Sequence, residues 1–281
     1  MKSRLDCFPC CFAQVFRTGM IATDDQQTVK HLLDEVGDSM KELPLGSSPP
    51  EILKLMYEKI RDITGNFDPY KEIKQKSTEN ALKMYPYLKK IVAESEDRLF
   101  TAVKLAIAGN VIDMGIGKVF DVEHELDKAV KGQLAICDYE KFKGYLNKAE
   151  WVLYLGDNAG ESVLDRVLIE ELGKPVVFVV RGTPIINDVI YEDAVQAGID
   201  KVTDIITSGT SSPGTLLDDC TDEFKEIYYN ADMIISKGQG NYEALSTENA
   251  PIFFLLKAKC HVIAEDIGVN EGDIILKGPE S

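Results

Sequence analysis

The pattern of hydrophobic and polar positions changes once along the chain, near residue 148. Before this point, apolar residues recur every three or four positions, which is the spacing of an amphipathic helix. From Trp151 onward, short uninterrupted apolar runs alternate with stretches of helical spacing. This change predicts an all-helical N-terminal subdomain over residues 1–147 and an α/β domain over residues 148–281.

Three helices are predicted with defined ends in the first part. One begins at the Pro49-Pro50 pair and ends at Gly65, and its apolar residues repeat at helical spacing. A second stripe covers residues 81–92, where Pro86 is expected to kink or divide the helix. A third covers residues 99–107 and ends at the Gly-Asn pair that follows. No strand is predicted before residue 148.

The second part contains short apolar runs that predict strands. Because these runs do not alternate with polar residues, they are typical of parallel strands covered on both faces. The helix after the first run is expected to end at Gly173. The predicted strands are residues 151–155, 176–180, 202–206, 233–235 and 262–264.

The net charge of the chain excludes some classes of binding partner. With 47 acidic and 31 basic side chains, the formal net charge is −16. Such a surface repels nucleic-acid phosphates and anionic lipids, so neither partner is expected. No apolar run reaches the roughly 20 residues of a membrane span, and no signal peptide is recognised, so the cytosol is the expected location. An anionic substrate then needs local positive charge from a metal or from lysines.

Polar turns that contain glycine follow four of the predicted strands. In a parallel sheet these turns share the carboxyl edge, where open α/β sheets bind ligands. Glycine lets backbone N–H groups approach an anion, so the series predicts a site for phosphate or carboxylate. No dinucleotide or P-loop fingerprint occurs, so neither a dinucleotide cofactor nor a Walker-type ATPase is expected. The turns are residues 156–161, 181–184, 208–210 and 236–241.

Asp157 and Asn158 are the sharpest feature of these turns. Two hard oxygen ligands at a strand end suit Mg²⁺ or Mn²⁺ and leave positions for water and phosphate. Asn158 and Glu161 equally match a helix N-cap with its acidic partner. Asp188, beyond the next strand, is either a second carboxylate at the same edge or the cap of another helix. The residues alone leave both interpretations open.

Together these segments resemble the damage-control metal phosphatases, a family long catalogued as domain-of-unknown-function family eighty-nine. The Cys7-Phe8-Pro9-Cys10 start resembles its prokaryotic branch. The order and spacing of the matching segments extend across nearly the whole chain. The other matching segments are residues 109–113, 156–161, 184–189 and 237–243.

The resemblance implies a helical subdomain on a Rossmann-like, three-layer α/β/α domain with a mainly parallel sheet. It implies a metal-dependent phosphatase that hydrolyses phosphomonoesters of small metabolites, such as sugar phosphates or damaged phosphometabolites. The catalytic divalent metal (Mg²⁺, Mn²⁺, Co²⁺ or Ni²⁺) is implied at Asp157, Asn158 and Asp188. The residues expected to contact substrate are Asn110, Asp113, Glu161, Lys237, Gln239, Gly240, Asn241 and Lys259.

The predicted position of Lys259 conflicts with the substrate contact that is expected of it. The eukaryotic branch has an Arg-Thr-x-Lys motif, and the comparable stretch, residues 256–259, keeps only the lysine. Because Lys259 precedes the predicted strand at residues 262–264, it is expected at the wrong edge of a parallel sheet. It reaches the site only if that strand is antiparallel or if the lysine lies on a turn of its own.

Several alternatives remain open at this point. The attacking group is either water or Asp157. A non-catalytic phosphometabolite sensor, or a SAM-dependent carboxyl methyltransferase, is an alternative function. Cys7 and Cys10 have the spacing of a zinc knuckle or a redox pair, but no second pair exists. A structural role is favoured, with the thiols packed under the helical cap and remote from the carboxylates in sequence.

Overall fold

A computed structural model describes residues 1–109, 124, 126 and 128–280 of the chain. Asn110 and Asp113, which are expected to contact substrate, lie outside the described residues. The described part contains a seven-stranded sheet in the order β1-β7-β6-β5-β2-β3-β4. Its strands are β1 (Ile136–Cys137), β2 (Val152–Leu155), β3 (Val176–Val180), β4 (Asp204–Thr207), β5 (Ile234–Lys237), β6 (Ile252–Lys257) and β7 (Ile274–Lys277).

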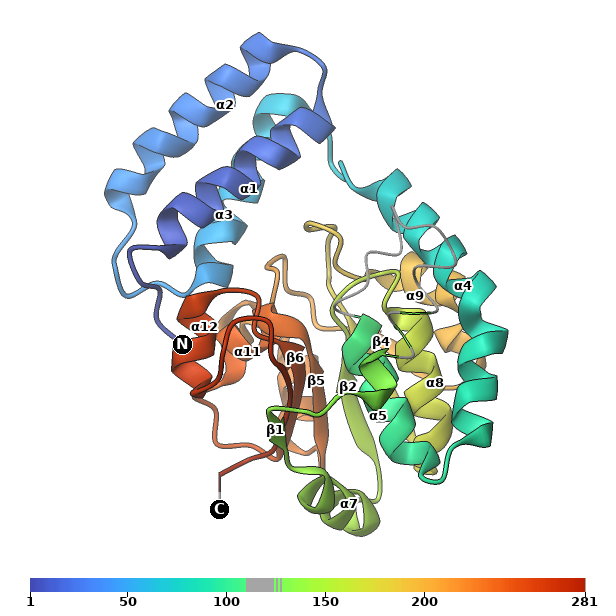
Figure 1. Cartoon of the computed structure of the whole chain (residues 1–281). Coiled ribbons are helices and arrows are strands. Elements are labelled where there is room, and N and C mark those ends of the chain that lie inside the picture. The colour runs from blue at the N-terminus through green and yellow to red at the C-terminus, as the bar shows by residue number, and fades with distance from the viewer. Residues whose placement is uncertain (110–123, 125, 127, 281) are drawn as a thin grey trace.

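Helices precede the sheet and connect its strands (Figure 1). Those before β1 are α1 (Cys7–Ala22), α2 (Gln26–Ser39), α3 (Pro49–Thr64), α4 (Lys71–Glu94) and α5 (Arg98–Gly109). Those after it are α7 (Tyr139–Lys148), α8 (Ser162–Leu172), α9 (Tyr191–Ala197), α10 (Asp222–Tyr229), α11 (Gly238–Leu245) and α12 (His261–Ile267).

The sheet is mainly parallel, as predicted. Of its neighbouring pairs, only β6 and β7 are antiparallel. Four predicted strands are confirmed as β2, β3, β4 and β5, with ends that differ by a few residues at most. The carboxyl ends of the neighbouring strands β6, β5, β2 and β3 therefore lie along one edge.

The end of the chain differs from the prediction. The run at residues 262–264, predicted as a strand, belongs to α12, which ends at Gly268 with φ 84°. β6 and β7 provide the strands instead, and β1 adds a short strand before residue 148, where none was predicted. Three apolar residues in a row fit a buried helix face as well as a strand, so the run alone could not separate them.

Two apolar layers cover the sheet because side chains alternate along each strand. In β2, Val152 and Tyr154 join the core under α4, α5, α7, α8 and α9. Leu153 and Leu155 join the opposite core, with residues of α10, α11 and α12. The domain is therefore a three-layer α/β/α structure, as the resemblance implied.

The helices before β1 divide into two groups. α4 and α5 pack against α8 and each other on one face of the sheet, and Pro86 lies inside an undivided α4. The helices α1, α2 and α3 form a small core of their own and stand apart from the sheet (Figure 1). We call these three helices the helical subdomain. A separate domain over all of residues 1–147 stays a prediction.

Helix α3 begins and ends where the sequence predicted. Ser48 and Glu51 form a capping box, with Pro49 and Pro50 in the first turn. Gly65 follows the last turn with φ 66°, a left-handed conformation that glycine adopts without steric cost. These local signals fix both ends of the helix that supports the subdomain core.

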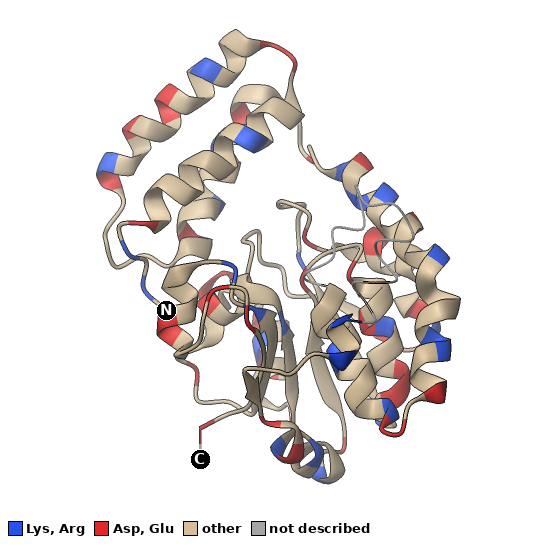
Figure 2. Cartoon of the chain, viewed as in Figure 1, with Lys and Arg blue, Asp and Glu red and all other residues tan. Residues whose placement is uncertain are grey.

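Acidic and basic residues are interspersed along the exposed surfaces of α2 and α4 (Figure 2). On α2, Lys30 pairs with Asp34 one helical turn later. Within the described residues, no helix is long and apolar enough to cross a membrane.

Lys74 joins α4 to α9 through a buried ion-pair cluster. Its Nζ lies 2.8 Å from Asp193 Oδ2 and 3.0 Å from Asp68 Oδ2, and its side chain is 1% exposed. We expect Lys74→Ala to lower the free energy of unfolding by about 3–5 kcal/mol, because it leaves partly buried carboxylates without a cation. Urea unfolding measures this change. Lys76→Ala, at an exposed position of the same helix, should change it by less than about 0.5 kcal/mol.

Candidate active site

Backbone contacts between two strand-end turns bring the predicted metal ligands together. Asn158 and Asp188 form an isolated antiparallel bridge beyond the ends of β2 and β3. The N–H of Val189 donates to the carbonyl of Asp157 at 2.8 Å, and that of Ala159 donates to Asn187 at 3.0 Å. Asp157, Asn158 and Asp188 therefore lie on adjacent backbones at the carboxyl edge of the sheet.

Neither Asn158 nor Asp188 caps a helix. Helix α8 begins at Ser162 after Glu161, and α9 begins at Tyr191 after Ile190. Asp193, inside α9, accepts the hydrogen bond from the N–H of Ile190 at 3.1 Å. The capping alternative is thus wrong for both residues, and their side chains remain for the site.

Arg181 lies between the two carboxylates; it opens the predicted turn at residues 181–184 but was not among the expected site residues. Its Nε donates to Asp188 Oδ2 at 2.8 Å, and its Nη2 lies 4.0 Å from Asp157 Oδ1. Its Nη1 and Nη2 also donate to Thr215 Oγ1 and Asn241 Oδ1, both at 3.2 Å. The only signal in the sequence was an arginine directly after a strand in an acidic chain.

Burial shifts the carboxylates toward their neutral forms. Desolvation raises the pKa of Asp188 to about 7, although Arg181 acts to lower it. Desolvation, and then the charge of Glu161, raises the pKa of Asp157 against the opposing effects of Lys259 and Arg181. Two buried carboxylates with raised pKa values mark a place where additional positive charge would be stabilising.

Behind the predicted metal ligands, a buried network fixes the orientation of Asn158. Its Nδ2 donates to Asp157 Oδ2 and to Glu161 Oε2, both at 3.0 Å. Lys237 Nζ donates to Glu161 Oε1 and, at 2.6 Å, to Asp165 Oδ1. Burial lowers the pKa of Lys237, but the two carboxylates outweigh it and hold that pKa well above its usual value.

The start of α11, which follows β5 directly where a turn was predicted, also depends on close backbone approach. Gly238 has φ 78°, and a Cβ at this position would lie 1.9 Å from Asp157 Oδ2. Asn241 Nδ2 donates to the carbonyls of Gly156 and Lys237 at 3.1 and 2.8 Å. Glycine is thus required at position 238 for the backbone to fit beside the carboxylate of Asp157.

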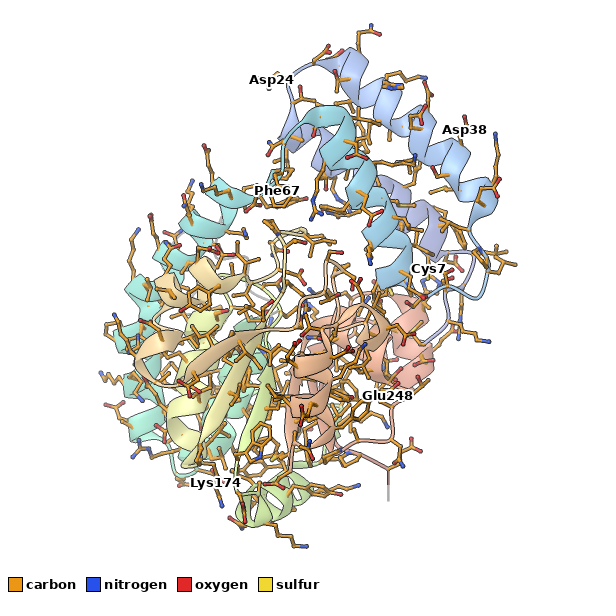
Figure 3. All side chains as sticks on the ribbon, turned by 180° about the vertical axis from the view of Figure 1, so that it is seen from behind. Cys7, Asp24, Asp38, Phe67, Lys174 and Glu248 are labelled. Atoms are coloured by element: carbon orange, nitrogen blue, oxygen red, sulfur yellow. The ribbon has the colours of Figure 1, made fainter. Side chains whose placement is uncertain are left out.

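A cavity of about 510 Å³ opens above these residues. One wall comes from the sheet edge and includes Asp157, Asn158 and Asp188. The other comes from α1 and the start of α3. Figure 3 places Cys7 at the base of the helical subdomain, beside the sheet domain. The sheet edge and the helical subdomain therefore enclose the candidate active site together.

Lys259 lies at the correct edge of the sheet. It follows β6, which runs parallel to β5, and it lines the cavity. Its backbone N–H donates to Gln239 Oε1 at 3.0 Å. The conflict over its position arose because residues 262–264, which belong to α12, were predicted as the next strand.

The residues expected to contact substrate fall into three groups. Gln239, Gly240 and Lys259 line the cavity. Glu161, Lys237 and Asn241 are buried behind its wall and do not line it. Asn110 and Asp113 lie outside the described residues. A contact with substrate stays a prediction for each of them.

The cysteines do not lie where they were expected. Cys7 and Cys10 are remote from the carboxylates in sequence, but both line the same cavity as Asp157, and Cys10 is exposed rather than packed under the helices. The N-terminal end of α1 extends to α12, where His261 Nε2 lies 3.7 Å from Asp6 Oδ1. Only Cys11 is packed in the core of the helical subdomain.

The ligand set fits a hard divalent cation. Within the described ranges, no three His, Cys, Asp or Glu side chains form a metal-binding group, so the expected site has two carboxylates and an amide. Oxygen ligands of this kind suit Mg²⁺ or Mn²⁺, which retain water and substrate oxygens as further ligands. Carboxylates also outnumber cationic side chains around the cavity, so a bound cation would reduce the excess of negative charge there.

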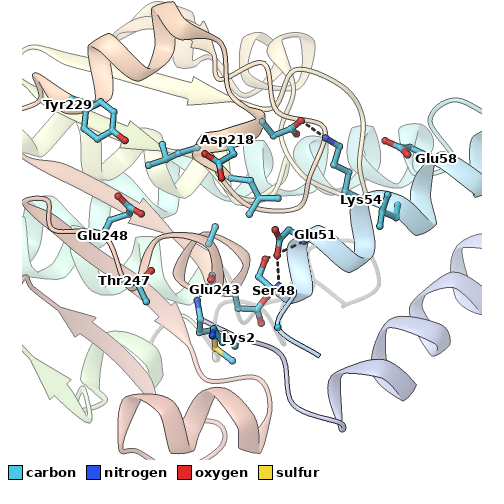
Figure 4. A pocket seen from close by; sticks show the side chains of 17 residues that line it. Lys2, Ser48, Glu51, Lys54, Glu58, Asp218, Tyr229, Glu243, Thr247 and Glu248 are labelled. Carbon is cyan, nitrogen blue, oxygen red and sulfur yellow. Dashed lines mark hydrogen bonds and ion pairs between the residues drawn. The ribbon is translucent and has the colours of Figure 1, made fainter. Parts of the chain in front are cut away.

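A second cavity of about 690 Å³ lies on the other side of α3 (Figure 4). An ion pair between Lys54 and Asp219 joins α3 to the loop before α10 beside it. Carboxylates dominate its charged lining, so it repels a phosphorylated ligand. The acidic lining residues are Glu51, Glu58, Asp218, Asp219, Glu243 and Glu248.

Comparisons with known proteins identify the family of this chain. The family model of the damage-control phosphatase ARMT1-like domain matches residues 4–275. A damage-control phosphatase of Archaeoglobus fulgidus is 36% identical, over 99% of this chain and 99% of its own. A damage-control phosphatase of Pyrococcus horikoshii is 37% identical, over 98% of this chain and 97% of its own.

A solved structure shows the same fold. The crystal structure of a DUF89 family protein from Pyrococcus horikoshii superposes with a TM-score of 0.94 at 34% identity, covering 100% of both chains. Membership of the prokaryotic branch with the Cys-x-x-Cys start stays a prediction. The family itself is shown by the model match and by relatives that align over nearly their whole length: this chain belongs to the damage-control phosphatase ARMT1-like domain family.

Proposed function

We propose that this protein is a divalent-metal-dependent phosphatase that hydrolyses phosphomonoesters of small metabolites. The observation that carries the proposal is the placement of Asp157, Asn158 and Asp188 side by side in a cavity that Lys259 also lines. The names of the relatives support phosphatase activity. The expected cytosolic location stays a prediction.

The metal ligands would be carboxylate oxygens of Asp157 and Asp188 and the amide oxygen of Asn158. When bound, a divalent cation supplies the positive charge that phosphoryl transfer requires at the phosphoryl oxygens. Asn158 donates through its nitrogen to Asp157 and Glu161, so its amide oxygen remains for a ligand. Arg181 holds Asp188 at Oδ2 and so fixes the orientation of that carboxylate.

The two lysines have different roles in this proposal. Lys259 lines the cavity and would offset the charge of the phosphoryl group directly. Lys237 is completely buried and binds Glu161 and Asp165, so it is a positioning residue that acts through Glu161 on Asn158. The phosphate contact first expected of Lys237 therefore passes to Lys259.

The paired carboxylates favour an enzyme over a non-catalytic sensor. A sensor for phosphorylated ligands would gain nothing from Asp157 and Asp188 at the binding edge, since both repel the ligand unless a cation is present. A metal-dependent hydrolase requires such oxygen ligands. No contact within the described residues favours a methyltransferase.

Asp157→Asn should abolish turnover and leave the fold intact, because it preserves the shape of the side chain but removes the charge that holds the cation. Hydrolysis of a phosphomonoester panel with Mg²⁺, Mn²⁺, Co²⁺ or Ni²⁺ measures the effect, and a chelator should abolish wild-type activity reversibly. Asp200→Asn, at an exposed position, is the charge-matched control. Near-normal turnover of Asp157→Asn, or wild-type activity in excess chelator, would contradict the metal site.

Lys259→Met and Lys237→Met should separate phosphate binding from positioning. Lys259→Met should lower kcat/KM by about tenfold to a hundredfold with little change in Tm, because it removes one charged contact at the cavity wall. Lys237→Met leaves Glu161 and Asp165 buried without their cation, so it should lower the free energy of unfolding by about 3–5 kcal/mol. Steady-state kinetics and thermal unfolding of both variants test this, and a destabilised but fully active Lys259→Met would refute the assignment.

A further inference from the structure

Arg17 lies on the helical wall of the active-site cavity. It occupies the third turn of α1, and it lines the same cavity as Asp157 and Lys259. Its side chain is exposed, so its charge is available to a molecule in the cavity. The cavity therefore has a cationic group on each of its two walls, from segments far apart in the sequence.

The guanidinium of Arg17 is held in place by Gln14. Arg17 Nε and Nη2 donate to Gln14 Oε1 at 3.3 and 2.8 Å. This two-point contact fixes the plane of the guanidinium and uses only two of its five N–H donors. An ordinary solvent-exposed arginine has no such support, and it loses side-chain entropy when it binds a ligand.

The side-chain amide of Gln14 is held in turn by hydroxyl groups on its other side. Its Nε2, with two N–H groups, lies 3.0 Å from Tyr70 Oη, 3.3 Å from Thr18 Oγ1 and 3.4 Å from Tyr57 Oη. Tyr57 is 2% exposed and belongs to the core of the helical subdomain. The orientation of Arg17 is thus built on buried groups of α1 and α3.

Arg17 differs from four of the other five arginines in its charge partners, and the fifth, Arg61, donates instead to the carbonyl of Pro184. Arg4, Arg98, Arg166 and Arg181 each form an ion pair with a carboxylate. Among the described residues, no carboxylate lies within 4.0 Å of the Arg17 guanidinium. In a chain of net charge −16, an oriented arginine without an internal acidic partner suits an external anion.

We propose that Arg17 binds a second anionic group of the substrate, so that the enzyme prefers phosphomonoesters with a distal carboxylate or phosphate. The proposal rests on the proposed function for the phosphoryl end of the cavity. The metal ligands and Lys259 receive the phosphoryl group that is hydrolysed, and Arg17 receives the distal oxyanion. Arg17 is then a specificity-determining residue supplied by the helical subdomain.

The test uses pairs of phosphomonoesters that differ in the distal anion. Glycerol 3-phosphate is compared with 3-phosphoglycerate for the carboxylate, and fructose 6-phosphate with fructose 1,6-bisphosphate for the phosphate. The full-length enzyme with Mn²⁺ should show a higher kcat/KM for the member with the distal anion. Arg17→Gln should lower this selectivity ratio by about tenfold to a hundredfold, which is the effect of losing a charged hydrogen bond.

Arg4→Gln is the matched control, because it removes the same charge from an arginine paired with Glu265 outside the cavity. Its selectivity ratio should equal that of the wild type. Gln14→Leu should lower the ratio in the same direction as Arg17→Gln, since it releases the guanidinium. Tm values of all three variants confirm that they fold.

Calorimetric binding of the same pairs separates this inference from the proposed function. Absence of hydrolysis, with tighter binding of the distal-anion member that Arg17→Gln abolishes, would refute the phosphatase proposal and support the role of Arg17. Metal-dependent hydrolysis with equal selectivity ratios in wild type and Arg17→Gln would overturn the role of Arg17 alone. Equal binding of both members of each pair to the wild type would also overturn it.

Discussion

The buried guanidinium of Arg181 is the interaction on which the candidate active site depends. It is 2% exposed and contacts Asp188, Thr215 and Asn241, with Asp157 at 4.0 Å. Without it, the two carboxylates would be buried side by side with no cation between them, which is strongly unfavourable. Because its partners come from the loop after β3, from the loop before α10 and from helix α11, one side chain holds three segments together at the ends of the strands.

The loop between β3 and α9, which contains Asp188, also contacts the helical subdomain. Ile185 is 1% exposed and packs in the core of α1, α2 and α3, only three residues before Asp188. Arg61 of α3 donates to the carbonyl of Pro184 in the same loop. Ile186 adopts φ 45°, an uncommon conformation for a β-branched residue, at this junction. This loop contacts both the core of the helical subdomain and the site at the sheet edge. It therefore holds α1 where Arg17 can line the cavity, although α1 stands apart from the sheet.

Charges around the site are arranged in two layers. Lys237 is enclosed with Glu161 and Asp165, and Glu161 in turn accepts a hydrogen bond from Asn158. Lys259 and Arg17 face the cavity, where a phosphorylated ligand would meet them. In the proposed function, the inner layer stabilises the predicted metal ligands, and the outer layer would supply the positive charge that an anionic substrate requires in a protein of net charge −16.

The sequence by itself determined what depends on neighbours along the chain. The periodicity predicted β2 to β5 and the ends of α3, and the order of strand-end turns placed Asp157, Asn158 and Asp188 at one edge. Only the tertiary structure decided which charges meet, because Arg181, Lys237 and Lys259 have their neighbours on other strands and helices. The sequence around a lysine that follows a strand does not distinguish a side chain buried in an ion pair from one that faces a cavity. The packing of segments distant in the sequence determines which of the two occurs.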